Sequence, residues 1–251
     1  MHITIIGSRN VAWHLSHAFI QAGHIIDAIA SRNILHASQL ALSLPHVPAI
    51  VLQDIPSTSD LYLIAVTDSS IKQVAQEMGN VKGVVVHTSG ASSISLLNRF
   101  DNHGVLYPCQ TFTKGDTIDY NNLPFFIEGN NSDSMKTINN LAHSVSSMVE
   151  SASSEQRTHL HISAVLASNF TNHLLYLAEQ HMKNNNMNFE MLRPLVCQTV
   201  NKAFRYSPYE AQTGPARRHD VNTIEKHKEL IADPTALNIY DVLTNSIEKS
   251  Y

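Results

Sequence analysis

The segment from Ser154 to Met182 holds polar side chains whose types suit proton transfer and hydrogen bonding. His161 is the best proton donor among them, because an imidazole titrates near neutral pH. A side-chain amide can hold a substrate oxygen or nitrogen, and a guanidinium can hold a carboxylate. We therefore expect a catalytic group of His161, Asn169 and Asn172, with Arg157 and Ser168 in contact with the substrate.

A single helix would align these side chains. The 29 residues of the segment include no glycine or proline, so they can form one helix about 40 Å long. At about 100° per residue, a polar strip then runs between two apolar faces. The strip consists of Arg157, His161, Ser168 and Asn172. A helix with two apolar faces is usually buried, and its polar groups either bond to neighbouring helices or line a ligand cleft.

Structural roles remain open for two of these residues. His161 could be a core histidine that bonds to a neighbouring group, which is more common than a catalytic one. Arg157 could simply pair with Glu155 or with Asp220.

Residues 2–30 have the pattern of a strand, a glycine turn, a helix and a second strand. The β-branched run His2–Ile6 ends at Gly7, helical spacing follows over Asn10–Ala22, and Ile25–Ala30 is strand-like. This order predicts the opening of a doubly wound α/β sheet. The turn Gly-Ser-Arg-Asn-Val-Ala matches the first and last positions of the dinucleotide pattern G-x-G-x-x-G/A.

Arg9 replaces the middle glycine of that pattern, where the backbone normally approaches a pyrophosphate. Its guanidinium could block the phosphates or contact them. Both roles of Arg9 remain possible at this stage. The turn residues expected to bind a cofactor are Gly7, Ser8, Arg9, Asn10 and Val11.

The end of the second strand favours NADP over NAD. NAD enzymes usually place an acidic residue there for the ribose hydroxyls, whereas this chain has Ser31, Arg32 and Asn33. A hydroxyl, a guanidinium and an amide suit a 2′-phosphate. The nearby acid, Asp27, lies four residues earlier, in mid-strand. The alternative is an ordinary surface loop.

Two further strands are expected to end at the same edge of the sheet. Leu61–Val66 is followed by Asp68, which can cap a helix over Ile71–Met78, and Gly83–His87 precedes a Thr-Ser-Gly turn. Open α/β sheets bind ligands at the carboxyl ends of their strands. Alternatively, the hydroxyls of Thr67, Thr88 and Ser89 could only cap helices. The additional cofactor residues expected here are Val66, Thr67, Asp68, His87, Thr88 and Ser89.

Composition narrows the class of function. The 251 residues carry a net charge of −4 and no basic run, which argues against nucleic acid. The 15 histidines are scattered and the two cysteines are far apart, so we expect no metal site. No run approaches 18 apolar residues, and the start lacks a signal-peptide pattern. We expect a cytoplasmic protein without a membrane segment.

The order of elements predicts two domains. Strands and helices alternate over residues 1–150, with shorter strands at Gly104–Tyr107 and Pro124–Glu128 and a helix at Met135–Ser147. Residues 151–251 read as helix only. The stretch Met187–Tyr206 is apolar on more than one face, so we expect a homodimer formed through the helical domain. Its apolar residues include Met191, Leu192, Leu195, Val196 and Val200.

Several motifs together resemble a known family. They are GSRNVAWHL, the SRN after the second strand, HTSGA, YPCQTF, SEQR followed by SNFTNH, and TGPARR. Over nearly the whole chain the sequence is similar to Rossmann-like proteins with a DUF2520 domain. These belong to the wider clan of 6-phosphogluconate and β-hydroxyacid dehydrogenases and pyrroline-5-carboxylate reductase.

The resemblance implies a Rossmann domain, a helical 6-phosphogluconate dehydrogenase C-terminal-like domain that commonly dimerises, and an active site between them. Gln110, Thr111 and Arg217 of the shared motifs are then expected to contact the substrate. Two departures matter: Arg9 stands where relatives usually have glycine, and the acid/base lysine of the β-hydroxyacid dehydrogenases is missing. The positions four residues before Asn169 and Asn172 hold valine and serine.

The leading interpretation is therefore an NADP(H)-dependent oxidoreductase acting on a small carbonyl or imine. A non-catalytic NADP-binding redox sensor is the alternative, and Arg9 and the missing lysine favour it slightly. A methyltransferase would explain the glycine turn but not the helical domain.

Overall fold

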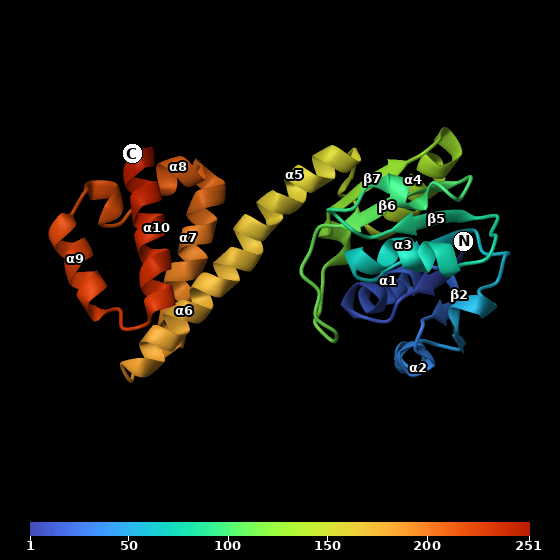
Figure 1. Cartoon of the computed structure of the whole chain (residues 1–251), viewed down its shortest axis with the longest axis horizontal. Helices are drawn as coiled ribbons and strands as arrows, with labels where there is room; N and C mark the ends of the chain where they lie inside the picture. The colour runs from blue at the N-terminus through green and yellow to red at the C-terminus, as the bar shows by residue number, and fades with distance from the viewer. The chain divides into compact units, whose positions relative to one another are not determined.

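An eight-stranded sheet with the order β3-β2-β1-β4-β5-β6-β7-β8 is the centre of the first part of the chain (Figure 1). All neighbouring strands are parallel except β6 and β7, which are antiparallel. The strands are β1 (His2–Ile6), β2 (Ile25–Ala30), β3 (Ala49–Ile50), β4 (Leu61–Ile64), β5 (Val84–His87), β6 (His103–Pro108), β7 (Phe125–Gly129) and β8 (Val149–Ser151).

The computed structural model describes residues 1–251, which form two units, residues 1–165 and 166–251. Four helices of the first unit cover the two faces of the sheet: α1 (Asn10–Gln21), α2 (Ile34–Ala41) and α4 (Ser132–Val145) on one face, and α3 (Asp68–Glu77) on the other. A fifth helix, α5 (Ser154–Ala164), follows β8.

Successive side chains of the central strands enter two separate cores, as the alternation of a strand requires. Leu61 and Leu63 of β4 pack with α1, α2 and α4 on one face. Tyr62 and Ile64 pack with α3 on the other. Both faces are therefore buried, which explains why β1, β4 and β5 read as almost continuous apolar runs.

The chain reverses its direction across the sheet between β1 and β4, because β2 lies on one side of β1 and β4 on the other. In open α/β sheets the crevice at such a reversal, outside the carboxyl ends of the strands, is where ligands bind. The predicted doubly wound fold and its first strand–helix–strand unit are confirmed. Three short α-helices or strands of the first unit had not been predicted: α2, β3 and β8.

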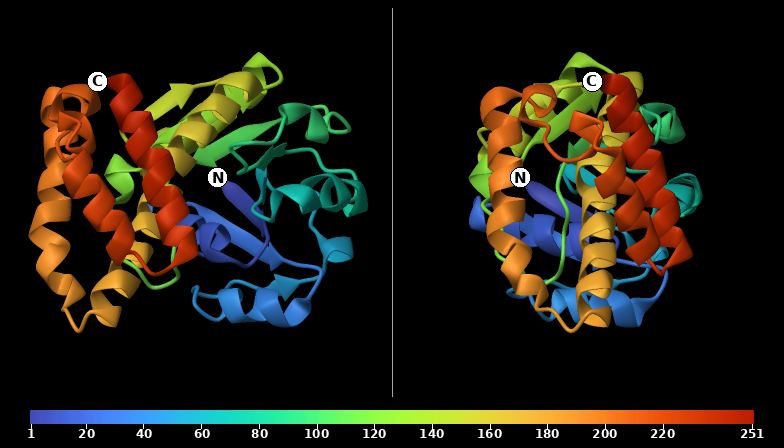
Figure 2. Two further views of the ribbon diagram at one scale, coloured as in Figure 1. Left: turned by 60° about the vertical axis from the view of Figure 1, so that its left-hand side comes forward. Right: turned by 90° about the vertical axis from the view of Figure 1, so that its left-hand side faces the viewer.

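The second unit contains helices and no strand, as the prediction of a helical C-terminal domain requires (Figure 2). No helix of the chain is both long and apolar enough to span a bilayer. The helices of this unit are α6 (Thr171–Asn184), α7 (Arg193–Tyr206), α8 (Pro208–Ala211), α9 (Val221–Leu230) and α10 (Pro234–Ser250).

The predicted single helix from Ser154 is continuous but not α-helical throughout. Ser153 caps it, with its side chain accepting from the N–H of Gln156 in a capping box. A π-helical segment, Val165–Phe170, separates α5 from α6. A π-helix bonds residue i to i+5 and so holds more residues per turn. The assumption of a constant 100° per residue is therefore wrong across this segment.

Candidate functional site

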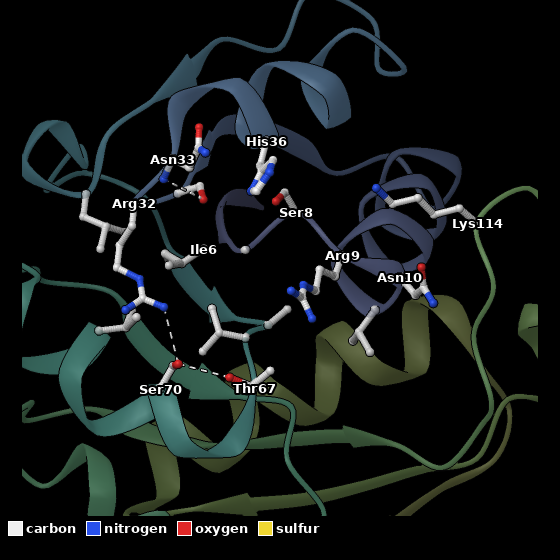
Figure 3. Close-up of a pocket in the computed structure, with 17 residues that line it drawn as sticks. Ile6, Ser8, Arg9, Asn10, Arg32, Asn33, His36, Thr67, Ser70 and Lys114 are labelled. Carbon is white, nitrogen blue, oxygen red and sulfur yellow. Dashed lines mark hydrogen bonds between the residues drawn. The ribbon is translucent and has the colours of Figure 1, made fainter. Parts of the chain in front are cut away.

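A cavity of about 810 Å³ opens at the carboxyl ends of β1, β2 and β4 (Figure 3). It lies at the place where the chain reverses direction across the sheet. Ten of the residues expected to bind a cofactor line it: Gly7, Ser8, Arg9, Asn10, Val11, Ser31, Arg32, Asn33, Val66 and Thr67. Seven further lining residues had not been predicted from the sequence: Ile6, His36, Leu52, Ala65, Ser70, Val74 and Lys114.

Gly7 allows the tight turn between β1 and α1. Its φ is +127°, and a Cβ at this position would lie 2.2 Å from the carbonyl oxygen of Ala65. Its N–H donates to the carbonyl of Ala30 at 2.9 Å, which ties the turn to the end of β2. No residue other than glycine fits this position without displacing β4.

Arg9 replaces a glycine without backbone strain. Its φ and ψ of −91° and −167° are extended values that any residue adopts, and its carbonyl accepts the first bond of α1. The first turn of α1 has no acidic residue and no side-chain cap. Figure 3 shows the Arg9 guanidinium reaching into the cavity between Ser8 and Thr67. The turn and this cation together form a site that favours a phosphate group.

Positive charge dominates the cavity. Arg9, Arg32 and Lys114 line it together with His36, and no aspartate or glutamate does. The mid-strand acid Asp27 faces elsewhere, since its carboxylate accepts from Ser59 at 2.6 Å and pairs with His2 at 2.7 Å. An anionic ligand therefore meets no repelling carboxylate in this cavity.

Arg32 lies at the end of β2 and is directed across the cavity by two long bonds from its guanidinium. One goes to Oε1 of Gln73 at 3.3 Å and the other to Oγ of Ser70 at 3.4 Å. The side-chain oxygen of Asn33 caps α2 by accepting from the N–H of Leu35, which leaves its amide nitrogen as a donor. The donors available to a phosphate here are Arg32, the Ser31 hydroxyl and the Asn33 amide nitrogen.

Four expected cofactor residues do not line the cavity. Asp68 is the first residue of α3 and Thr67 is its N-cap, so the predicted cap was one residue late. Ser89 is buried, and its hydroxyl accepts from the N–H groups of Ala91 and Ser92. Thr88 is half-buried, and its N–H donates to the carbonyl of Ile64.

His87, the fourth, is fully buried and neutral. Its Nδ1 accepts from the N–H of Ser89 at 3.2 Å, and its Nε2 lies 3.3 Å from the carbonyl oxygen of Ser93. Burial, reinforced by the positive charge of Arg157, lowers the pKa of His87 to about 4. Its side chain therefore orders the loop after β5 and does not line the cavity.

Arg157 holds the start of α5 against the sheet. The side chain is fully buried, and its guanidinium pairs with Glu128 of β7. It also donates to the carbonyl of Ser92 at 2.9 Å and to Oγ of Ser154 at 3.2 Å. The expectation that it holds a substrate carboxylate is wrong, because the guanidinium is enclosed. Its acidic partner is neither of the two considered from sequence.

Tyr107 at the end of β6 is the partner of His161, the expected proton donor. The Tyr107 hydroxyl lies 3.4 Å from Nδ1 of His161, with the two rings edge to face. Burial, followed by the proximity of Cys109, raises the pKa of Tyr107, so its phenol stays protonated. The ring fits because Gly90 has no Cβ, which would lie 2.7 Å from it. Sequence reasoning missed Tyr107, although it precedes Pro108 at a strand's carboxyl end.

The other expected site residues are polar positions whose roles stay predictions. Ser168 and Asn169 lie in the π-helical segment, and Asn172 is in the first turn of α6. Both asparagines are exposed. Gln110 and Thr111 are exposed in the loop after β6. Arg217 lies over the ring of Tyr251 at 3.9 Å, a cation–π contact within the second unit.

Both halves of the chain match models of known protein families. The model of a Rossmann-like domain matches residues 1–109, and that of a domain of unknown function, DUF2520, matches residues 123–247. The comparison with curated proteins gave no match.

Among solved structures, the putative NADP oxidoreductase of Bacteroides fragilis is 33% identical, with a TM-score of 0.93 over 99% of this chain and 98% of that one. Pyrroline-5-carboxylate reductase from Streptococcus pyogenes is 16% identical, with a TM-score of 0.65 over 99% and 98%. A reductive aminase from Aspergillus terreus, in complex with NADPH and ethyl levulinate, is 14% identical, with a TM-score of 0.72 over 99% and 93%. The last two show a shared fold only.

Proposed function

Because the chain belongs to the family of Rossmann-like proteins with a DUF2520 domain, we propose that it is an NADPH-dependent oxidoreductase that reduces a small carbonyl or imine compound. The cavity at the carboxyl ends of β1, β2 and β4 carries this proposal. Three cations line it, no carboxylate does, and its glycine turn opens onto α1. NADPH has a pyrophosphate and a 2′-phosphate, so it needs two separate anion sites, and Arg9 and Arg32 lie at two places in the cavity that suit them.

Each anion site has its own residues. The turn after β1 and the first N–H groups of α1, with Arg9 beside them, suit the pyrophosphate. Arg32 and the Ser31 hydroxyl at the end of β2 suit the 2′-phosphate. Asp27 is held by Ser59 and His2, so no acid at this strand binds the ribose hydroxyls as it would in an NAD enzyme.

The bound cofactor supplies a hydride, and a side chain of the protein donates the proton. His161 is the proton donor of this proposal, because it is half-buried, sits beside Tyr107 at the carboxyl edge of the sheet, and carries an imidazole, the side chain most often used as a general acid. The protonated phenol of Tyr107 holds Nδ1 of His161 and thereby fixes the direction in which the ring presents its other nitrogen. A carbonyl needs this proton as its oxygen becomes a hydroxyl.

The proposal is tested in two steps. Calorimetric titration of the chain with NADPH and NADH checks the cavity, and steady-state NADPH oxidation with a panel of aldehydes, ketones and cyclic imines checks the reaction. Turnover of any panel member supports a reductase. Tight binding of NADPH without turnover across the panel favours the non-catalytic redox sensor.

We also propose that the protein acts as a homodimer through its helical unit. Four large apolar side chains of this unit are exposed over 189–206: Met191 at 75%, Leu195 at 64%, Val200 at 45% and Phe204 at 90%. No residue of α7 is buried within the single chain, so these side chains are available to pack against a second copy. Light scattering at micromolar concentration is expected to give the mass of two chains, and a monomer would contradict the proposal. Leu195→Glu with Phe204→Glu should then shift the mass toward one chain.

The two cysteines, Cys109 and Cys197, are both free thiols. Unpaired cysteines suit a reducing compartment, and this supports placing the protein in the cytoplasm.

A further inference from the structure

The loop between β6 and β7 extends to the cofactor cavity. It runs over residues 109–124 and contains one 3₁₀ turn, Tyr120–Asn122, although antiparallel neighbours such as β6 and β7 can be joined by a few residues. The side chain of Lys114, in this loop, lines the cavity together with Arg9 and Arg32. Lys114 was not among the residues predicted from the sequence to bind a ligand.

Two side chains of α1 fix this part of the loop. The amide of Asn10 donates to the carbonyl of Phe112 at 2.7 Å. Nε2 of His14, one turn later, lies 2.7 Å from the carbonyl oxygen of Thr113, and its Nδ1 lies 3.0 Å from the hydroxyl of Tyr120. Lys114 directly follows these two anchored carbonyls, and α1 is the helix that starts at the glycine turn.

His14 makes the most buried part of the contact between α1 and the β6–β7 loop. Its side chain is fully buried, and both ring nitrogens have partners in the loop. Its ring also lies 5.0 Å from that of Phe112. A buried histidine that directs both nitrogens to one loop holds that loop in a defined position, since a lost partner would leave a buried polar group unsatisfied.

Lys114 has a free charge. It takes part in none of the ion pairs and hydrogen bonds of the chain, and no acidic residue lines the cavity. Figure 3 shows its amine on the α1 side of the cavity, opposite Arg32. The two cations therefore lie on opposite sides of the cavity.

We propose that Lys114 is a pyrophosphate-binding residue delivered to the glycine turn by the β6–β7 loop, and that His14 is the residue that positions the loop. The inference rests on the proposed use of NADPH and adds a second cation, on a separate segment, to the Arg9 side of the site. Lys114 and Arg9 would hold the pyrophosphate from two directions, while Arg32 remains at the 2′-phosphate.

Calorimetry with NADPH and NADH separates these roles, because both contain the pyrophosphate and only NADPH has the 2′-phosphate. Lys114→Gln should weaken both dinucleotides by a similar factor, roughly tenfold or more for a lost charge-assisted bond. Arg32→Gln should weaken NADPH far more than NADH. Lys114→Arg should retain most of the affinity, and Lys136→Gln, an exposed lysine of α4, should change neither.

His14→Phe tests the positioning role. It should weaken both dinucleotides while keeping their affinity ratio, and it should speed tryptic cleavage after Lys114, because the loop is released from α1. In the wild-type chain, NADPH should protect this bond from trypsin. Thermal melting of each variant checks that the fold is retained.

Lys114→Gln with wild-type affinity for both dinucleotides would overturn the inference while leaving the proposed function intact. A loss confined to NADPH would place Lys114 at the 2′-phosphate and would also overturn it. Failure of the wild-type chain to bind either dinucleotide would overturn the proposed function and the inference together.

Discussion

The Tyr107 hydroxyl lies 3.4 Å from Nδ1 of His161, and this contact joins the end of β6 to α5. The phenol is buried and protonated, whereas the imidazole of His161 is half-buried. Such a pair can hold a histidine in one orientation while the histidine does the chemistry. It is the only partner that the structure gives to the proton donor predicted from sequence.

Replacing His161 should separate catalysis from cofactor binding. His161→Ala is expected to lower turnover by roughly 10²–10⁴-fold, the usual contribution of a general acid, with NADPH affinity nearly unchanged. His159→Ala, at an exposed position of the same helix, is the matched control. If His161 is only a structural histidine, its loss instead costs about 1–3 kcal/mol of stability and leaves turnover intact. Kinetics and melting of the same variant distinguish the two.

Cofactor preference should depend on Arg32. NADPH should bind at least about tenfold more tightly than NADH, because each charge-assisted bond to the 2′-phosphate contributes about 1.5–3 kcal/mol. Arg32→Asp should reverse the order, since a carboxylate repels the phosphate and accepts from the ribose hydroxyls. Lys72→Asp, at an exposed position of α3, controls for the change in net charge. Equal wild-type affinities for the two dinucleotides by calorimetry would contradict this assignment.

The glycine turn should tolerate no Cβ. Gly7→Ala places a methyl group against the carbonyl of Ala65 and forces alanine to a φ of +127°, so it should lower the melting temperature and abolish NADPH binding. Gly79→Ala is the control, because the space around Gly79 is open and its φ is not positive. A Gly7→Ala protein that binds NADPH normally would show that the turn does not form the cofactor site.

Stability should fall in mild acid because of His87. Its pKa is about 4 in the folded chain and near 6.5 when unfolded. Between these values the unfolded state binds a proton that the folded state does not, so stability is full above pH 6.5 and declines as pH falls toward 4. The loss is up to about 3 kcal/mol. His87→Asn should reduce stability at pH 7 but flatten this slope in denaturant melts, whereas His159→Asn should keep it.

Local sequence patterns were sufficient to predict most of the strands and helices. The run His2–Ile6, the glycine and the helix at Asn10 appear in the structure almost as predicted, because each is set by neighbours in sequence. The short elements α2 and β3 were missed because eight and two residues give too little periodicity. The π-helical segment was missed because periodicity assumes one turn size throughout.

Only those site residues that follow a strand end in the sequence could be predicted. Ser31, Arg32 and the glycine turn follow directly from strand ends, and they line the cavity. Arg157 was misassigned because its partner, Glu128, is 29 residues away and only the folded sheet brings them together. Tyr107 and Lys114 were missed for the same reason.

Deuterium transfer tests the central claim most directly. The chain is mixed with NADPH deuterated at the transferable C4 position and with the panel of carbonyls and imines, and the products are examined by mass spectrometry. A reductase of this kind should deliver the label to carbon in at least one product, and His161→Ala should slow that transfer while NADPH still binds. Saturating NADPH binding with no label in any product would contradict the account.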